Sequence, residues 1–196
     1  MKNNKMIKAF AILLALLMAG CSAPKPGAVA ESYLKGMKSQ IKETLGESLG
    51  SDPDGFFGGS EENEKKFYEL IGGYDYKIVD EVIDGDRADV DVEITTYDFG
   101  SMFMKFIQDY FVEALSLSYS GAGEEEIEAA STKVFTTSME DMEKEGKTFT
   151  EKVTVGLYKE NGKWMVDEQQ DADALTNAVA GGMIKALESL SQLSFE

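Results

Sequence analysis

Residues 87–97 read RADVDVEITTY, and this stretch decides the fold. Apolar side chains occupy every second position, from Ala88 through Val90 and Val92 to Ile94, and polar or acidic residues stand between them. A period of two places one set on each face of a β-strand, so this segment is predicted to be a strand with one buried and one solvated face. Residues 74–78 alternate in the same way, and Asp84-Gly85 supplies a turn between the two runs. We therefore expect an antiparallel hairpin here.

A second hairpin is predicted from residues 148–168, TFTEKVTVGLYKENGKWMVDE. Phe149, Val153, Val155 and Leu157 alternate with polar residues, and Trp164 and Val166 follow the turn. Asn161-Gly162 is the strongest turn signal in the chain, because both residues accept the positive φ angles of a two-residue hairpin turn.

The segments before, between and after the hairpins are predicted to be helices, because their apolar residues recur at helical intervals. Apolar residues recur every four positions over residues 28–49, and Ser60 is predicted to cap a short helix that Gly72 and Gly73 end. The loop between them contains Phe56 and Phe57, which we expect at the edge of the core or in a lid over a ligand or partner. Three further helices are expected over residues 98–119, 124–143 and 171–193; the first of them is the most hydrophobic and is predicted to be central.

The order helices, hairpin, helices, hairpin, helix predicts an α+β domain. Its helices should pack on one face of a curved antiparallel sheet, and a C-terminal helix should close it. Residues 28–196 are enough for a single domain with its own core.

The first 20 residues resemble a secretory signal peptide. Lys2, Lys5 and Lys8 precede an apolar run that is too short to span a bilayer stably. The run ends in Met18-Ala19-Gly20-Cys21, which resembles a bacterial lipobox, although Met18 replaces the usual Leu. The resemblance implies that Cys21 receives a diacylglyceryl group, whose two acyl chains, such as palmitate, anchor the protein stably. An ordinary signal peptide with a chance cysteine, or a plain buried thiol, is the alternative.

If Cys21 is lipidated, residues 21–27 form a Pro-rich tether and the domain lies on the outer face of the cell membrane. The membrane is then a partner through the lipid. Whether the cell has one membrane or two stays open.

The chain is strongly acidic, with 36 Asp and Glu against 19 Lys and Arg and a formal charge of −17. Removal of three leader lysines brings the mature chain to about −20. This charge excludes nucleic acid as a partner and keeps the domain away from anionic headgroups. Charged partners should be cationic peptides, metal ions or cationic small molecules, and solubility alone is the simpler explanation of the charge.

The chain contains no histidine and, apart from Cys21, no thiol. Ser-His-Asp catalysis and ordinary zinc sites are therefore excluded. The run DGDRADVD at residues 84–91 lacks the glycine and the terminal glutamate of an EF-hand loop. No P-loop or dinucleotide fingerprint is present. We expect no catalytic residues, no metal and no cofactor.

The segment YDYKIVDEVIDGDRADVDVEITTYDF at residues 74–99, together with GKWMVDE at residues 162–168, resembles Gram-positive lipoproteins of unknown function. Their domain is nuclear-transport-factor-2-like, a cystatin-like, cone-shaped roll, and its last element is often a strand rather than a helix. The resemblance implies a concave face. Its pocket would be lined by Tyr76, Tyr97, Phe103, Tyr110 and Trp164. The same aromatic residues also fit the core; a pocket of this kind would suit a small amphiphile or a peptide.

The sequence therefore favours a membrane-anchored extracytoplasmic lipoprotein that binds a cationic or amphiphilic small ligand or a surface protein. A small cone-fold enzyme that uses Asp or Glu with Tyr as acid and base, and a purely structural envelope protein, are the alternatives. Enzymatic activity is the less expected outcome, because the commonest catalytic side chains are missing.

Overall fold

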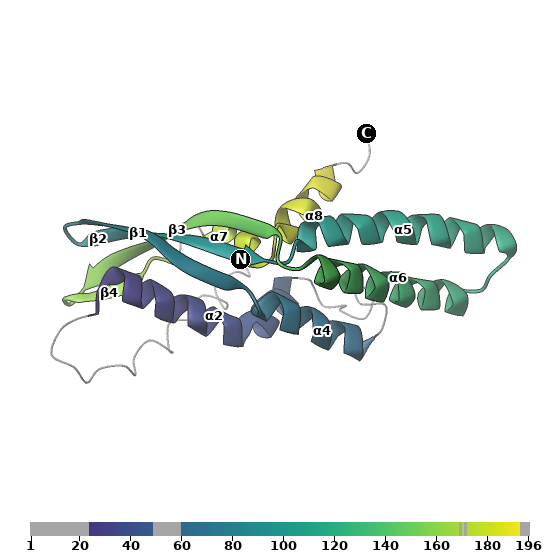
Figure 1. Ribbon diagram of the computed structural model, residues 1–196, viewed down its shortest axis with the longest axis horizontal. Coiled ribbons are helices and arrows are strands. Elements are labelled where there is room, and N and C mark those ends of the chain that lie inside the picture. The colour runs from purple at the N-terminus through teal and green to yellow at the C-terminus, as the bar shows by residue number, and fades with distance from the viewer. Residues whose placement is uncertain (1–23, 49–59, 169, 171, 193–196) are drawn as a thin grey trace, which may run out of the picture.

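The computed structural model describes residues 24–48, 60–168, 170 and 172–192, and Cys21, Leu49, Phe56 and Phe57 lie outside these ranges. Within them the chain has six helices and a four-stranded antiparallel sheet, which confirms the predicted α+β class (Figure 1).

Both predicted hairpins are present in the sheet, whose strand order is β1-β2-β3-β4. Strand β1 (Asp75–Asp84) pairs with β2 (Arg87–Thr96), and β3 (Phe149–Glu160) pairs with β4 (Lys163–Val166). Asn161 and Gly162 have φ angles of 52° and 78°, as a turn with two positive φ angles requires. The central pairing joins β2 to β3, with Thr96 opposite Phe149.

A bulge at Val79 changes which side chains of β1 face inward. Ile78 pairs with Val92, but the register then shifts, so that Glu81 pairs with Val90. One extra residue in one strand reverses which side chains beyond it point to the inner face of the sheet and which point to the outer face. Glu81 therefore shares the inner face of the sheet with Val90, and its carboxylate accepts a hydrogen bond of 2.7 Å from the backbone N–H of Gly27.

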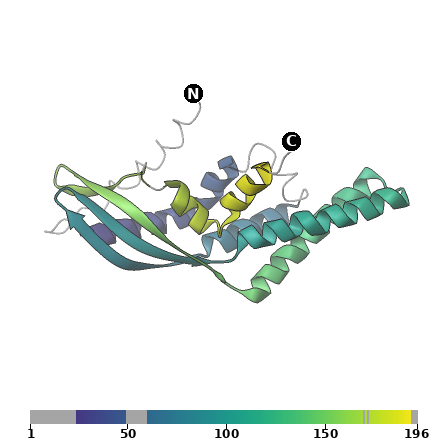
Figure 2. The ribbon, with the colours of Figure 1, turned by 90° about the horizontal axis from the view of Figure 1, so that it is seen from above.

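The inner face of the sheet forms the core. The four alternating residues of β2 are buried together with Val153, Val155 and Leu157 of β3. Helix α2 (Pro26–Ser48) contributes Leu34 to this cluster, and α7 (Ala172–Val179) contributes Leu175. Both helices lie on the same side of the curved sheet (Figure 2), which confirms the prediction that helices cover one face. Helix α2 begins at Pro26, two residues before the expected start of the domain.

Helix α4 (Glu61–Gly72) begins and ends as predicted. The Ser60 side chain accepts a hydrogen bond from the backbone N–H of Asn63, and Gly73 is the C-cap. Phe67 of α4 is fully buried and packs against Phe99 and Phe135, with ring centroids 5.4 and 6.3 Å away.

The prediction that residues 98–119 form the central helix is wrong. Helix α5 (Phe99–Ser120) contributes Phe99, Phe103 and Phe106 to the core, but it then extends beyond the sheet beside α6 (Glu124–Glu145) (Figures 1 and 2). Of residues 107–133, all of them described, Ala130 alone is buried. We call these residues the arm. High hydrophobicity predicts burial, but in the arm the apolar residues exceed what α6 can cover.

The prediction of one continuous C-terminal helix is also wrong. The chain forms α7 and then α8 (Met183–Gln192), separated at Gly181 and Gly182, whose φ angles are 55° and 79°. The break lets the chain pass close to the start of α5, where the backbone N–H of Gly100 donates to the carbonyl of Gly181 at 2.9 Å. A Cβ on Gly181 would lie 2.0 Å from the carbonyl oxygen of Tyr97. The contact explains why glycine stands here within an otherwise amphipathic helical pattern.

Candidate functional site

A groove of about 950 Å³ lies where α5 begins, between the first residues of β3 and the α7–α8 region. It is lined by residues from all three parts of the chain, namely Asp98, Gly100, Ser101, Met104, Lys105, Ile107, Gln108, Phe149, Thr150, Glu151, Asn177, Gly182, Lys185 and Ala186. Many of these side chains are exposed, so the groove is open to solvent. Its residues come from segments that are distant in sequence, which is why no local motif predicted it.

The polar side of the groove is a closed hydrogen-bonding network around Glu151. One carboxylate oxygen accepts from Lys185 Nζ at 2.8 Å and the other from Asn177 Nδ2 at 3.1 Å. The side-chain oxygen of the buried Asn177 accepts from the backbone N–H of Lys185 at 3.0 Å. These bonds fix α7 and α8 against β3, so the network positions helices.

Asp98 has a similar structural role at the start of α5. Its carboxylate accepts from the backbone N–H of Ser101 at 2.8 Å and from the Ser101 hydroxyl at 2.9 Å. The side chain is therefore an N-cap, which satisfies a backbone donor that the helix leaves free.

The apolar side of the groove continues along the arm. Met104 and Ile107 line the groove and are exposed, and the exposed apolar residues that follow on α5 are Phe111, Val112, Leu115 and Tyr119. Ile107, Phe111, Leu115 and Tyr119 follow one another at four-residue spacing, and Met104 and Val112 each lie three residues before a member of this row, so all six lie on one side of the helix. We call Met104, Ile107, Phe111, Val112, Leu115 and Tyr119 the α5 stripe. Phe111 and Val112 are 63% and 62% exposed and Tyr119 is 90% exposed, so the described residues leave the outer part of the stripe largely uncovered. Met104, Ile107 and Leu115 are 39%, 37% and 43% exposed.

A different side of α5 packs against α6. Phe106 meets Phe135 of α6 edge to face, with ring centroids 5.2 Å apart, and stacks on Tyr110 at 5.9 Å. These ring contacts between and within the helices do not involve the α5 stripe.

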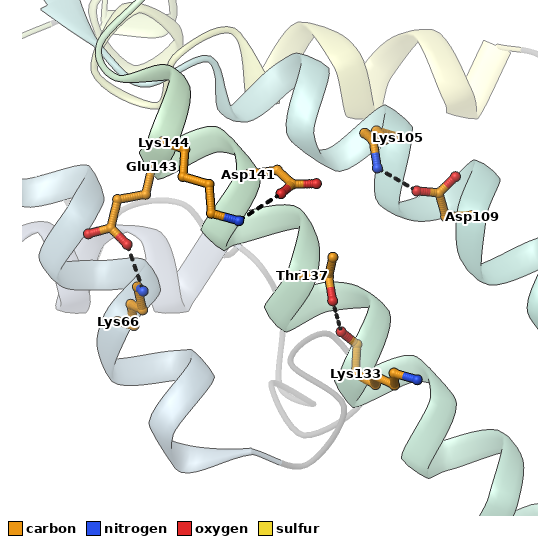
Figure 3. A network of polar contacts seen from close by, with 8 residues as sticks. All are labelled: Lys66, Lys105, Asp109, Lys133, Thr137, Asp141, Glu143 and Lys144. Carbon is orange, nitrogen blue, oxygen red and sulfur yellow. Dashed lines mark hydrogen bonds and ion pairs between the residues drawn. The ribbon is translucent and has the colours of Figure 1, made fainter.

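Charged side chains flank these helices (Figure 3). On α5, Lys105 Nζ lies 2.6 Å from an Asp109 carboxylate oxygen, and this hydrogen bond raises the pKa of Lys105. At the inner end of α6, Glu143 pairs with Lys66 of α4 at 2.7 Å, which links α6 to α4. Farther out, the Thr137 hydroxyl donates to the carbonyl of Lys133, whose side chain is exposed.

None of the five aromatic residues predicted to line a pocket lines the groove, although two of them, Phe103 and Tyr110, both pack against Phe106. Phe103 and Trp164 are buried, and Tyr76, Tyr97 and Tyr110 are half-buried against the core. Tyr97 packs on Phe99, and Lys159 Nζ lies 4.6 Å from the Trp164 ring.

A tyrosine and a carboxylate do meet at a second, very small hollow. Tyr33 and Glu168 line a space of about 10 Å³ under β3 and β4. Burial and the nearby Glu168 charge raise the pKa of Tyr33 to about 12, and burial raises the pKa of Glu168. The hollow has room for about one water molecule. The hollow is therefore too small to hold a substrate next to Tyr33 and Glu168.

Within the described ranges, no helix combines the length and the hydropathy needed to cross a bilayer. The same part of the chain contains no cluster of three or more carboxylates or other metal-binding side chains suited to a metal ion.

No protein-family model matches the chain, and no curated protein matches it. The chain is similar to a solved structure from Bacillus subtilis that is provisionally described as a lipoprotein (ycdA), with 16% sequence identity and a TM-score of 0.40. The alignment covers 80% of this chain and 47% of that chain, so it spans less than half of that protein. At this similarity the match assigns no function and no residue role, and the nuclear-transport-factor-2-like assignment stays a prediction.

Proposed function

We propose that the protein is a lipid-anchored extracytoplasmic interaction module that presents its α5–α6 arm to a protein partner. The observation that carries the proposal is the α5 stripe, a row of exposed apolar side chains whose outer members, Phe111, Val112 and Tyr119, are largely uncovered by the described residues. Contiguous exposed apolar surface is costly to keep in water, and such surface commonly marks a place where another molecule binds. The groove adds depth at the inner end of the same surface.

The position of the arm relative to the proposed anchor supports this function. Residues 22–25 alone separate Cys21 from the first residue of α2, and fully extended they reach about 15 Å. Helix α2 begins near the hairpin turns of the sheet, whereas the arm extends from the opposite end of the molecule (Figure 1). A lipid on Cys21 would therefore hold the sheet end near the bilayer and leave the arm free to meet a partner.

An enzyme that uses a tyrosine and a carboxylate is less well supported. The Tyr33–Glu168 pair has the right groups but lacks room for a substrate. In the groove, the carboxylates of Glu151 and Asp98 both accept hydrogen bonds that hold helices in place, so neither is an obvious acid or base for a substrate.

Photo-crosslinking in the source cells tests the proposal. A photoreactive amino acid replaces Phe111 or Leu115 on the α5 stripe, or Asp84 or Glu160 at the exposed hairpin turns as matched controls. We expect one discrete crosslinked product from both stripe positions and none of that mass from the controls. The absence of a product at Phe111 and Leu115, or the same product from all four positions, would contradict the proposal.

A further inference from the structure

The α5 stripe has the length of a helix-binding surface. It runs from Met104 to Tyr119, and a rise of 1.5 Å per residue gives it a length of about 22 Å, or roughly four helical turns. The apolar row is continuous, with gaps of three or four residues, so another helix can lie along it and form a third member of the bundle with α5 and α6.

The net charge of the arm selects the kind of helix. From Asp109 to Lys133 the chain has six acids, which are Asp109, Glu113, Glu124, Glu125, Glu126 and Glu128, against one base, Lys133. Asp109 is neutralised by Lys105, but the five glutamates are all exposed. Complementary charge favours a partner whose apolar face is bordered by Lys or Arg.

The same charges argue against two other occupants. A second copy of the chain would bring one acidic arm against another, and two mature chains of about −20 each repel one another. An anionic membrane surface would also be repelled, because Lys133 is the single base of the arm.

We infer that the partner docks a cationic amphipathic helix of about four turns along the α5 stripe, with its end in the groove at Met104 and Ile107. This inference rests on the proposed function and names the chemistry of the partner at the same surface. The apolar face of the guest helix covers Phe111 and Leu115, and its basic residues are drawn to the exposed glutamates of the arm.

The test uses three synthetic 16-residue peptides and the chain from residue 21 onward with Cys21→Ser. One peptide is an amphipathic helix with Leu on one face and Lys on the other. The second has the same composition in scrambled order, and the third replaces Lys by Glu. Fluorescence anisotropy at low and moderate salt measures binding. We expect the cationic amphipathic peptide to bind at least about tenfold more tightly than the scrambled one, and the acidic peptide not to bind. Equal binding of the first two peptides would overturn the inference.

Substitutions then locate the binding. Phe111→Ser and Tyr119→Ser should each weaken the cationic amphipathic peptide at least about fivefold, whereas Ser116→Ala, exposed on the same helix, should leave its affinity unchanged. The pair Glu125→Gln and Glu128→Gln, both exposed on the arm, should weaken binding and reduce its salt dependence. The control pair Asp84→Asn and Glu160→Gln removes the same charge at the sheet end and should not. Equal effects of the two charge pairs would show binding to net charge alone and refute the docking site.

The two proposals can fail separately. Suppose that Phe111 gives a crosslinked product in cells but the cationic amphipathic peptide does not bind in vitro. This result would reject the cationic helix as the partner's chemistry and would still support the interaction module. Peptide binding at the stripe without any crosslinked product in cells would reject the proposed function and keep the chemistry of the surface.

Discussion

The carboxylate of Glu81 on β1 accepts a hydrogen bond from the backbone N–H of Gly27, in the first turn of α2, with 2.7 Å between nitrogen and oxygen. The bulge at Val79 makes this bond possible, because it turns Glu81 to the inner face of the sheet. The glutamate satisfies a donor that the helix leaves free, and its negative charge lies at the positive end of the helix dipole. One side chain thus fastens the first described helix to the edge strand.

Removal of this bond should loosen α2. We expect Glu81→Ala to lower the free energy of unfolding by about 1 kcal/mol, and Glu81→Gln by less, because the amide oxygen still accepts. Urea denaturation measures both. Asp84→Ala, exposed on the same strand, is the control and should change stability by less than about 0.5 kcal/mol. Equal effects of Glu81→Ala and Asp84→Ala would show that the bond does not stabilise the fold.

The break between α7 and α8 should tolerate no side chain at its first glycine. Gly181→Ala places a Cβ against the backbone of Tyr97 at a positive φ, and we expect a loss of at least about 3 kcal/mol. Gly85→Ala is the matched control, because Gly85 also has a positive φ but has open space around it. Its cost should be about 1 kcal/mol. Similar midpoints of thermal unfolding for the two variants would contradict the close approach.

The α5 stripe and the core should respond differently to truncation. Phe106→Ala removes a buried ring and should cost about 3–5 kcal/mol, whereas Phe111→Ala should change stability by less than about 0.5 kcal/mol. Both phenylalanines lie on α5, so helix propensity is matched. A large loss for Phe111→Ala in urea denaturation would mean that the stripe is covered in the free protein.

Glu168 should make the fold less stable as pH rises above the ordinary range for a glutamate. Burial raises the pKa of Glu168, so the folded state holds its proton more tightly than the unfolded state does. Between the ordinary and the raised pKa, the free energy of unfolding therefore falls with increasing pH. Glu168→Gln should raise the melting temperature at pH 7, on the order of 2 °C, and give almost no gain near pH 3, where the glutamate is mostly protonated in both states.

Net charge is the main competing explanation for such a gain, since any removed acid relieves repulsion in this chain. Glu160→Gln, exposed at the end of β3, is the control. An equal gain from both variants across pH 3–8 would assign the effect to net charge.

Cys21 should determine membrane attachment. We expect Cys21→Ser to move the protein from the detergent-extracted membrane fraction to the soluble extracytoplasmic fraction, or to leave an uncleaved precursor. Intact mass of the wild-type chain should show a diacylglyceryl group on a polypeptide that begins at residue 21. A wild-type protein without lipid, or a serine variant that stays equally membrane-bound, would reject the anchor.

The sheet was predictable from sequence because its signals are local. The alternation over residues 87–97 and the Asn161-Gly162 turn each depend on neighbouring residues, and the structure confirms both hairpins. Ser60 as a cap and Gly73 as the end of α4 are likewise determined by the backbone of one short segment.

The errors share a tertiary cause. The Gly181-Gly182 pair is itself a helix-breaking signal, but the amphipathic pattern of residues 171–193 outweighed it, and the close approach to Tyr97 involves a segment that is far away in sequence. The prediction that α5 is central was wrong because hydrophobicity alone does not show whether an apolar surface is covered by the same chain or by another molecule. The groove could not be predicted, since its residues come from α5, β3 and the α7–α8 region.

The segment that carries the arm starts and ends at one residue pair of the sheet, Thr96 opposite Phe149. A segment inserted between two paired neighbours can change in length without shifting the register on either side. Whole helical turns could be added to or removed from α5 and α6 together while β2 and β3 stay paired. The scaffold and the arm are in this sense separable modules, so one sheet could carry arms of different reach and surface, and an arm could be transplanted to another hairpin.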